Sequence, residues 1–381
     1  MKIGIVTFWQ TRDNYGQMLQ CLALQYKLKE MGHDPYLIRY AHSEYQYSLR
    51  AKIVYAIKKI LKFDWSRLKL NGPLLSIASS KDKSRDFDGF RKTYIKQSQK
   101  KYYSLAELRN DPPSADCYIV GSDQVWSRSL DTDDGKVFYL EFGAKSIKKV
   151  AYAVSFGNVV FDRKRLKQLK CRSAKFDFIS VRESEGMDVC SQAGISATHV
   201  LDPTMLLLPQ DYISLLNLEK RKEETIFIYA LNISAPDELG WDDIKSFADK
   251  ANLSVIITPS SGYIQGGELF GDNEKYYYSS ISEWCSTILS SKLVVTTSFH
   301  GVVFCILFHT PFVYVPLKGR FSKGNNRVLN LLEMLNLQRC IYHAGLDYFN
   351  FTEMNINWQV VDDILKEYRN KSIFFLKSAL K

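Results

Sequence analysis

Apolar runs that predict buried strands alternate with segments whose apolar residues recur at helical spacing, and this pattern fills the first half of the chain. Strands are predicted at residues 2–8, 34–40, 115–121, 149–156, 178–182 and 198–201, and helices at residues 17–31, 163–175 and 184–193. Strands that alternate with helices build parallel sheets covered by helices on both faces. The pattern therefore predicts an α/β domain.

The same alternation returns after residues 206–224, which indicate an interdomain connection. Strands are predicted at residues 225–231, 253–258, 292–297 and 312–315, and helices at residues 241–251, 281–290, 301–309, 328–335 and 358–377. We therefore expect an α/β fold of two Rossmann-like domains that face each other across a cleft. The first domain is expected at residues 1–210 and the second at 211–350, with a C-terminal helix in 351–381 that packs back on the first domain.

Positive charge is concentrated in one part of this plan. The net charge is +10, and residues 50–101 alone hold an excess of eleven positive charges, so the remainder is close to neutral. We expect this region to be a helical basic insertion at about residues 45–110, with a basic amphipathic helix over 49–62. Such a helix either contacts an anionic membrane surface or packs on its own domain with a solvated basic face. The basic residues form no recognition element for nucleic acid, so no nucleic-acid partner is expected.

The first apolar run of the chain and the spacing of its cysteines indicate the cellular compartment. The apolar run at residues 2–9 is too short for a signal peptide, and no other run is long enough to span a membrane. The seven cysteines are scattered, without a Cys-x-x-Cys pair or a zinc-like cluster. We expect a cytoplasmic protein, and peripheral contact at the inner face of the membrane is one of the two roles open to the basic region.

The most informative motif lies where the predicted strand 292–297 runs into an apolar helix through Ser298-Phe299-His300-Gly301. Ligands and catalytic groups collect at the carboxyl ends of parallel strands, beside the N-termini of the helices that follow. This position favours a functional role for His300. The alternative is that Ser298 simply caps the helix and that His300 is an ordinary hydrogen-bonded residue.

Three further groups follow predicted strand ends or begin helices. Arg182 ends the strand 178–182, where it either binds an anion or forms a salt bridge with Glu183 or Glu185. Asp123 and Trp126 follow the strand 115–121, and a carboxylate with an aromatic ring is able to hold a sugar. Their alternative roles are a turn cap and a core residue. Residues 318–327 form a basic loop, which either binds an anion or is solvated.

Four segments together resemble the polysaccharide pyruvyltransferase family over roughly residues 1–340. They are Asn14-Tyr-Gly16-Gln17, Val120-Gly-Ser-Asp123-Gln-Val-Trp126, Ser180-Val-Arg182-Glu183 with Asp202-Pro203, and Ser298-Phe-His300-Gly301 followed by Asn326-Arg327. The resemblance implies a GT-B-like fold and transfer of the pyruvyl group of phosphoenolpyruvate to hydroxyls of a cell-surface polysaccharide or its lipid-linked precursor sugar. It implies neither a metal nor an organic cofactor.

The resemblance also implies roles for individual residues. His300 is the acid/base candidate. The residues expected to bind the donor's phosphate and carboxylate are Arg182, Ser298, Gly301, Asn326, Arg327, Lys318 and Arg320. The residues expected to bind the acceptor sugar are Asn14, Gly16, Asp123 and Trp126. Many relatives have an Arg-x-His pattern, and this chain has Ser298 in the arginine position. Arg327 or the lysines and arginine of the basic loop are then expected to replace the missing guanidinium.

Two other functions remain open on the same frame. One is a glycosyltransferase of GT-B type that uses a nucleotide-sugar donor. The other is a protein without catalytic activity that binds glycans or assists their assembly. Binding of phosphoenolpyruvate rather than a nucleotide sugar separates the first alternative from pyruvyl transfer. A cleft without convergent arginine and histidine side chains would favour the second.

Overall fold

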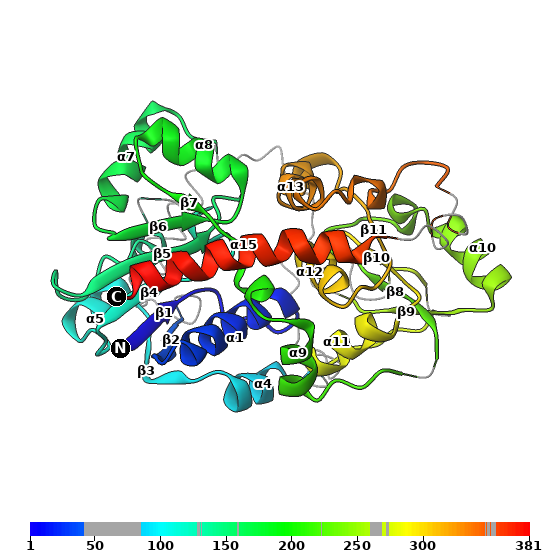
Figure 1. Ribbon diagram of the computed structural model, residues 1–381, viewed down its shortest axis with the longest axis horizontal. Coiled ribbons are helices and arrows are strands. Elements are labelled where there is room, and N and C mark those ends of the chain that lie inside the picture. The colour runs from blue at the N-terminus through cyan, green and yellow to red at the C-terminus, as the bar shows by residue number, and fades with distance from the viewer. Residues whose placement is uncertain are drawn as a thin grey trace, which may run out of the picture.

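The first half of the chain folds around a parallel sheet of seven strands in the order β3-β2-β1-β4-β5-β6-β7 (Figure 1). This is a computed structural model, and it describes residues 1–41, 85–127, 130, 132–157, 160–221, 223–259, 269–271, 274–346, 348, 351 and 356–381. The strands are β1 (Lys2–Val6), β2 (Asp34–Tyr40), β3 (Gln97–Tyr102), β4 (Cys117–Val120), β5 (Lys148–Val154), β6 (Phe178–Val181) and β7 (Thr198–His199). The strand order reverses between β1 and β4, and the carboxyl ends of the strands at such a reversal are the usual ligand position in these sheets.

Helices cover both faces of this sheet. They are α1 (Tyr15–Glu30), α4 (Phe87–Tyr94), α5 (Leu105–Asn110), α6 (Asp133–Phe138), α7 (Arg163–Ser173) and α8 (Ser184–Ala193). Helix α1 begins where Asn14 adopts an extended conformation and its side chain accepts a hydrogen bond from the Gln17 backbone N–H. Most of its residues are buried between the sheet and the second half of the molecule.

The prediction of a helical insertion at about residues 45–110 needs correction. The basic helix predicted over 49–62 lies outside the described residues. Within the described part, residues 97–102 form β3, an edge strand that pairs in parallel with β2. This strand has the sequence Gln-Ser-Gln-Lys-Lys-Tyr, and only Tyr102 is buried. An edge strand with two wet faces needs no apolar alternation, so hydrophobic periodicity gave no sign of it.

The second half folds around a smaller parallel sheet in the order β11-β10-β8-β9. Its strands are β8 (Thr225–Tyr229), β9 (Ser254–Ile257), β10 (Leu293–Thr296) and β11 (Phe312–Tyr314). The helices are α9 (Pro209–Leu216), α10 (Trp241–Ala251), α11 (Ile281–Ser290), α12 (Phe299–Leu307) and α13 (Asn326–Met334). Two parallel α/β sheets, each with covering helices, confirm the predicted class of two Rossmann-like domains.

The C-terminal helix α15 (Trp358–Ala379) runs along both domains (Figure 1). At its start the Trp358 indole stacks on His309 of the second domain, with ring centroids 4.9 Å apart. Near its end Ser372 Oγ accepts a hydrogen bond from the Leu201 backbone N–H at 2.9 Å, and Leu376 lies in the apolar core beneath β1 and β4. Helix α15 therefore fixes the two domains to each other.

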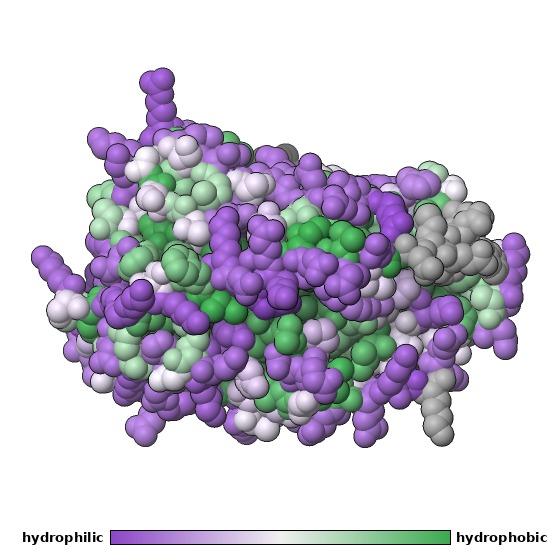
Figure 2. Space-filling model, viewed as in Figure 1, coloured by the Kyte–Doolittle hydropathy of each residue, from purple (hydrophilic) through white to green (hydrophobic). Residues whose placement is uncertain are grey.

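The surface on the α15 side is mainly hydrophilic, with smaller apolar areas next to the helix (Figure 2). Among the described helices, none combines the length and the apolar character that a membrane span requires.

We expect Leu376→Ala to destabilise the protein by about 2–5 kcal/mol, because it leaves a cavity in a fully buried position. The measurement is the free energy of unfolding from urea denaturation. The matched control is Phe374→Ala, two residues earlier on the same helix, where the ring is 70% exposed. The control should change stability by about 0.5 kcal/mol at most. Equal losses in the two variants would contradict the described contact of α15 with the first domain.

Candidate active site

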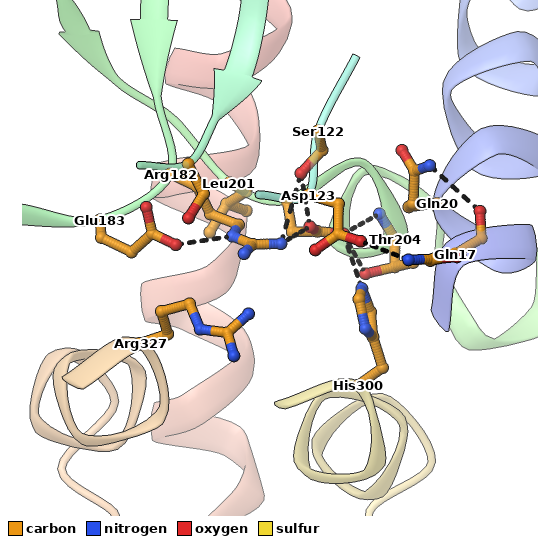
Figure 3. A network of polar contacts seen from close by, with 12 residues as sticks. Gln17, Gln20, Ser122, Asp123, Arg182, Glu183, Leu201, Thr204, His300 and Arg327 are labelled. Atoms are coloured by element: carbon orange, nitrogen blue, oxygen red, sulfur yellow. Dashed lines mark hydrogen bonds and ion pairs between the residues drawn. The ribbon is translucent and has the colours of Figure 1, made fainter. Parts of the chain in front are cut away.

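The predicted site residues come from strand ends in both domains. The loop after β1 leads to Asn14, β4 is followed by Asp123, β6 by Arg182, and β10 by His300. Figure 3 shows these elements converging, with Arg182, Arg327 and His300 extending toward a common space. Because both parallel sheets present their carboxyl ends here, the site lies at the junction of the two domains.

His300 lies in the first turn of α12 rather than in a free loop. Ser298 precedes the helix, and its hydroxyl accepts a hydrogen bond from the Gly301 backbone N–H at 3.2 Å. The capping alternative is therefore correct for Ser298. It fixes the helix start and thereby the direction of the His300 side chain, which is only 7% exposed.

The histidine of the second domain packs directly on α1 of the first. A Cβ atom added to Gly16 would lie 1.9 Å from His300 Nδ1, a distance that no pair of such atoms tolerates. Only glycine therefore allows this approach. Glycine is required at position 301 for a different reason, because a Cβ atom there would lie 2.4 Å from Thr296 Oγ1 in the preceding strand. Both predicted glycines act as close-packing positions next to the histidine.

Arg182 is held by two carboxylates. Its Nε donates to Glu183 Oε1 at 3.1 Å, and its Nη1 donates to Asp202 Oδ2 at 2.7 Å. Its guanidinium lies over the ring of Phe299 from the second domain, 4.5 Å from the centroid. Burial acts to lower the pKa of Arg182, but Glu183 and Asp202 outweigh it and raise the pKa above its usual value. The side chain is therefore charged, and its Nη2 is buried without a hydrogen-bond partner among the described residues.

Asp202, which no single-residue prediction identified, connects the charged groups of the site. It is fully buried, and its Oδ1 accepts from Thr204 N at 3.0 Å and from Thr204 Oγ1 at 2.7 Å. Its Oδ2 accepts from Ser122 Oγ at 2.7 Å as well as from Arg182. Burial acts to raise the pKa of Asp202, but His300, Arg182 and Thr204 together hold that pKa well below its usual range. Its signal in the sequence was the Asp-Pro pair after a short strand.

His300 faces the same carboxylate. Its Nε2 lies 3.8 Å from Asp202 Oδ1, which is beyond hydrogen-bond distance, and this nitrogen is also buried without a hydrogen-bond partner in the described part of the chain. Buried donors and acceptors without partners are uncommon and cost about 1–3 kcal/mol each. Arg182 Nη2 and His300 Nε2 are two such atoms within one interdomain site.

The predicted acceptor residues are arranged around the start of α1. Asn14 is the cap of that helix, as described above. Asp123 has a positive φ of 76°, which turns the chain after β4, and its Oδ2 accepts from Gln17 Nε2 at 3.1 Å. Gln17, which was not predicted, thus orients the Asp123 carboxylate from the first domain's helix.

Trp126 lies in the core of the first domain. The side chain is 1% exposed, stacks on Tyr139 with centroids 4.7 Å apart, and donates its Nε1–H to the Phe138 carbonyl at 3.1 Å. The alternative interpretation as a core residue was correct. The reason is that the indole's one polar atom already has a partner inside the domain, so the ring fills the core completely.

Of the predicted basic residues in 318–327, Arg327 lies at the site and the others lie outside it. Gln124 accepts hydrogen bonds from Arg327 Nη1 and Nη2 at 2.8 and 2.9 Å in the amide orientation that satisfies both side chains. Burial, and next the nearby Arg182, lower the pKa of Arg327. Among the described residues Arg327 forms no ion pair with a carboxylate. Lys318 and Asn326 are exposed, and Arg320 lies in the short 3-10 helix Gly319–Asn325.

A cavity of about 280 Å³ adjoins these arginines on the side of α15. Arg182, Asp202 and Arg327 line it together with Asn330 and Tyr368. Arg182 of the first domain and Arg327 of the second thus border one partly open cavity. No cluster of three or more potential metal ligands occurs in the described ranges.

The fold defines a class of protein, in which two Rossmann-like domains meet at the carboxyl ends of their strands in the GT-B arrangement. Within this class the chain belongs to the polysaccharide pyruvyl transferase family, whose model matches residues 14–318. The protein is therefore a transferase, and the family activity is pyruvyl transfer to polysaccharide. Comparison with curated proteins gave no match.

Solved structures of similar fold are distant in sequence. UDP-GlcNAc 2-epimerase from Methanocaldococcus jannaschii is 13% identical, with 86% of this chain and 87% of that chain covered at a TM-score of 0.46. The Neisseria meningitidis epimerase is 9% identical, with 98% and 94% covered at 0.47. Acinetobacter baumannii MurG is 10% identical, with 97% and 94% covered at 0.42.

We expect Gly16→Ala to destabilise the protein by about 1–3 kcal/mol, because the added methyl group overlaps the His300 ring. The measurement is a double-mutant cycle of unfolding free energies with His300→Ala, which removes the ring. In the His300→Ala background the methyl group should cost much less, since the space it needs is then open. The same cost in both backgrounds would contradict the close approach of α1 and His300.

Proposed function

We propose that the protein transfers the pyruvyl group of phosphoenolpyruvate to hydroxyls of a cell-surface polysaccharide or its lipid-linked precursor sugar. The observation that carries this proposal is the pair of guanidinium groups beside His300. Arg182 has an unpartnered buried Nη2, and Arg327 lacks a carboxylate partner in the described part of the chain. Phosphoenolpyruvate carries one phosphate and one carboxylate, which are the anions that guanidinium groups bind best.

The residues of the donor site follow from this assignment. Arg182, from the first domain, binds one anionic group, and Arg327, from the second, binds the other. Arg327 thereby replaces the guanidinium that relatives have at the position of Ser298. Ser298, Gly301 and Asn326 shape the helix starts next to the donor, while Lys318 and Arg320 belong to the adjoining basic loop and attract the anion at longer range.

His300 is the proposed general acid and base. The acceptor hydroxyl oxygen forms a bond to C2 of phosphoenolpyruvate, and C3 takes a proton from the protonated imidazole. The neutral imidazole then accepts the proton that the hydroxyl oxygen loses. The bond between C2 and the phosphate oxygen then breaks, its electron pair leaves with the phosphate, and the arginines stabilise that anion. A second acceptor hydroxyl adds at C2, and its proton passes to the released phosphate.

The acceptor sugar is proposed to lie beside α1. The Asp123 carboxylate, oriented by Gln17, accepts hydrogen bonds from sugar hydroxyls, and Asn14 and Gly16 border the same space. This arrangement places the acceptor on the first-domain side of His300. In this proposal the two domains, with their expected boundary near residue 210, each contribute one arginine to the donor site.

We expect phosphoenolpyruvate to raise the melting temperature of the protein, whereas UDP-GlcNAc leaves it unchanged, because a ligand stabilises only the fold that binds it. Thermal denaturation with each ligand at the same concentrations is the measurement. Arg182→Lys should reduce affinity for phosphoenolpyruvate about 10- to 100-fold, since a lysine loses the paired geometry of the guanidinium. Arg163→Lys, at an exposed position of α7, is the matched control and should bind normally.

His300→Ala separates binding from chemistry in the same experiment. This variant should retain stabilisation by phosphoenolpyruvate and lose about 100- to 10,000-fold in release of inorganic phosphate with a competent acceptor. Stabilisation by UDP-GlcNAc alone, or full turnover by His300→Ala, would overturn the proposed function.

We further propose a cytoplasmic location with peripheral contact at the inner face of the membrane, where lipid-linked precursors are available. The described support lies on α7, where Arg163, Lys164, Lys167 and Lys170 are exposed and pair with no carboxylate among the described residues. A basic helix face of this kind is attracted to anionic headgroups.

We expect the full chain to co-sediment with vesicles that contain phosphatidylglycerol but not with pure phosphatidylcholine vesicles, and the binding should weaken as salt rises. Replacing Lys164 and Lys167 by Glu should reduce the bound fraction. Replacing Lys250 and Lys275 by Glu, both exposed in the second domain, is the charge-matched control. Binding that is independent of anionic lipid, or lost equally in both double variants, would exclude the α7 contact.

A further inference from the structure

The buried carboxylate of Asp202 lies between the two groups to which the proposed reaction assigns donor binding and proton transfer. Asp202 precedes the short 3-10 helix Pro203–Leu206, next to the strands of the first domain, and its side chain has no exposed surface. One of its oxygens holds Arg182, and the other faces His300 of the second domain at 3.8 Å. One carboxylate thus acts on both domains.

The two oxygens are held differently. Oδ2 is shared by Arg182 Nη1 and Ser122 Oγ, both at 2.7 Å. Oδ1 receives both donors of Thr204 and also faces the imidazole. These four hydrogen bonds fix the position of the carboxylate. Of its two oxygens, Oδ1 is the one that faces the His300 ring.

The groups that surround His300 come from several elements. Gly16 of α1 contacts its ring, Asp202 faces its Nε2, and Phe299 of its own helix packs against Arg182. Figure 3 places Asp123 on the first-domain side and Arg327 on α13 around the same space. Among the described residues, Asp202 is the carboxylate at ion-pair distance from the imidazole. Arg182 and Arg327 are the nearby cations.

We propose that Asp202 is a positioning residue that stabilises the protonated form of His300 across the domain junction while it orients Arg182 for the donor anion. This proposal rests on the proposed function for its catalytic meaning. The interaction of Asp202 with the imidazole itself is expected in the protein without substrate as well. The pair joins two domains, because Asp202 belongs to the first domain and His300 to the second.

The interaction is testable without substrate, so that its failure is distinguishable from failure of the proposed function. The full chain is labelled at histidine Cε1, and the midpoint of each histidine titration is followed by NMR; His300→Gln identifies the His300 signal among the six. In Asp202→Asn the His300 midpoint should fall by about one pH unit, because the variant keeps the shape of the side chain but removes the charge that favours the imidazolium. An unchanged His300 midpoint in folded Asp202→Asn would overturn the proposal.

Thr204→Val provides a second variant that keeps the charge. It removes the 2.7 Å hydrogen bond from Oδ1 and leaves more of that oxygen's charge to act on His300, so the midpoint should rise by a few tenths of a pH unit. The two variants thus move the same signal in opposite directions. If Asp202→Asn does not fold, an unchanged or lowered midpoint in Thr204→Val overturns the proposal.

Activity then gives the catalytic consequence. With phosphoenolpyruvate and a competent acceptor, the alkaline limb of the kcat/KM profile in Asp202→Asn should move to lower pH by the same amount as the NMR midpoint. A loss of kcat/KM with an unmoved limb would show that Asp202 acts on the fold alone and would overturn the positioning role.

Discussion

The buried ion pair of Arg182 with Asp202 is the interaction on which the site depends. Two charges at a domain junction are costly to desolvate, and removing one partner of such a pair costs about 3–5 kcal/mol, because the other charge is left uncompensated. Here each partner has additional hydrogen bonds, with Glu183, Ser122 and Thr204, that offset the desolvation. The pair fixes the end of β6 to the segment that leads into the second domain.

Several features of the site follow from that junction. The Arg182 guanidinium lies on Phe299, so the start of α12 meets the first domain through a cation and a ring. The next residue, His300, then packs on Gly16 at the start of α1. Arg327 reaches back from α13 to Gln124 of the first domain. Each of these contacts joins opposite domains, and α15 supports them from outside. A site assembled in this way exists only when both domains are in place.

The departure from the Arg-x-His pattern has a physical explanation in this arrangement. Ser298 is a better helix cap than arginine, and its hydroxyl satisfies the Gly301 N–H that would otherwise lack an acceptor. Under the proposed function, the donor's guanidinium comes instead from Arg327 of α13, which Gln124 of the other domain orients.

The alternation of strands and helices, and the gathering of Arg182, Asp123 and His300 at strand ends, were predictable from the sequence, because both follow from local periodicity and from parallel-sheet geometry. The edge strand β3 was not, since a polar strand has no apolar alternation. Trp126 could not be assigned from the sequence, because only its partner at Phe138 shows that it is enclosed. Asp202 and the contact of Gly16 with His300 depend on approaches between distant segments, which no local pattern encodes.

Under the proposed function, two arginines from opposite domains hold phosphoenolpyruvate beside His300. The most direct measurement is a crystal structure of the full chain with phosphoenolpyruvate. We expect its phosphate and carboxylate to contact Arg182 Nη2 and the Arg327 guanidinium, with C3 within reach of the His300 imidazole. Phosphoenolpyruvate bound away from both arginines, or a site that accepts only a nucleotide sugar, would show that this donor site is wrong.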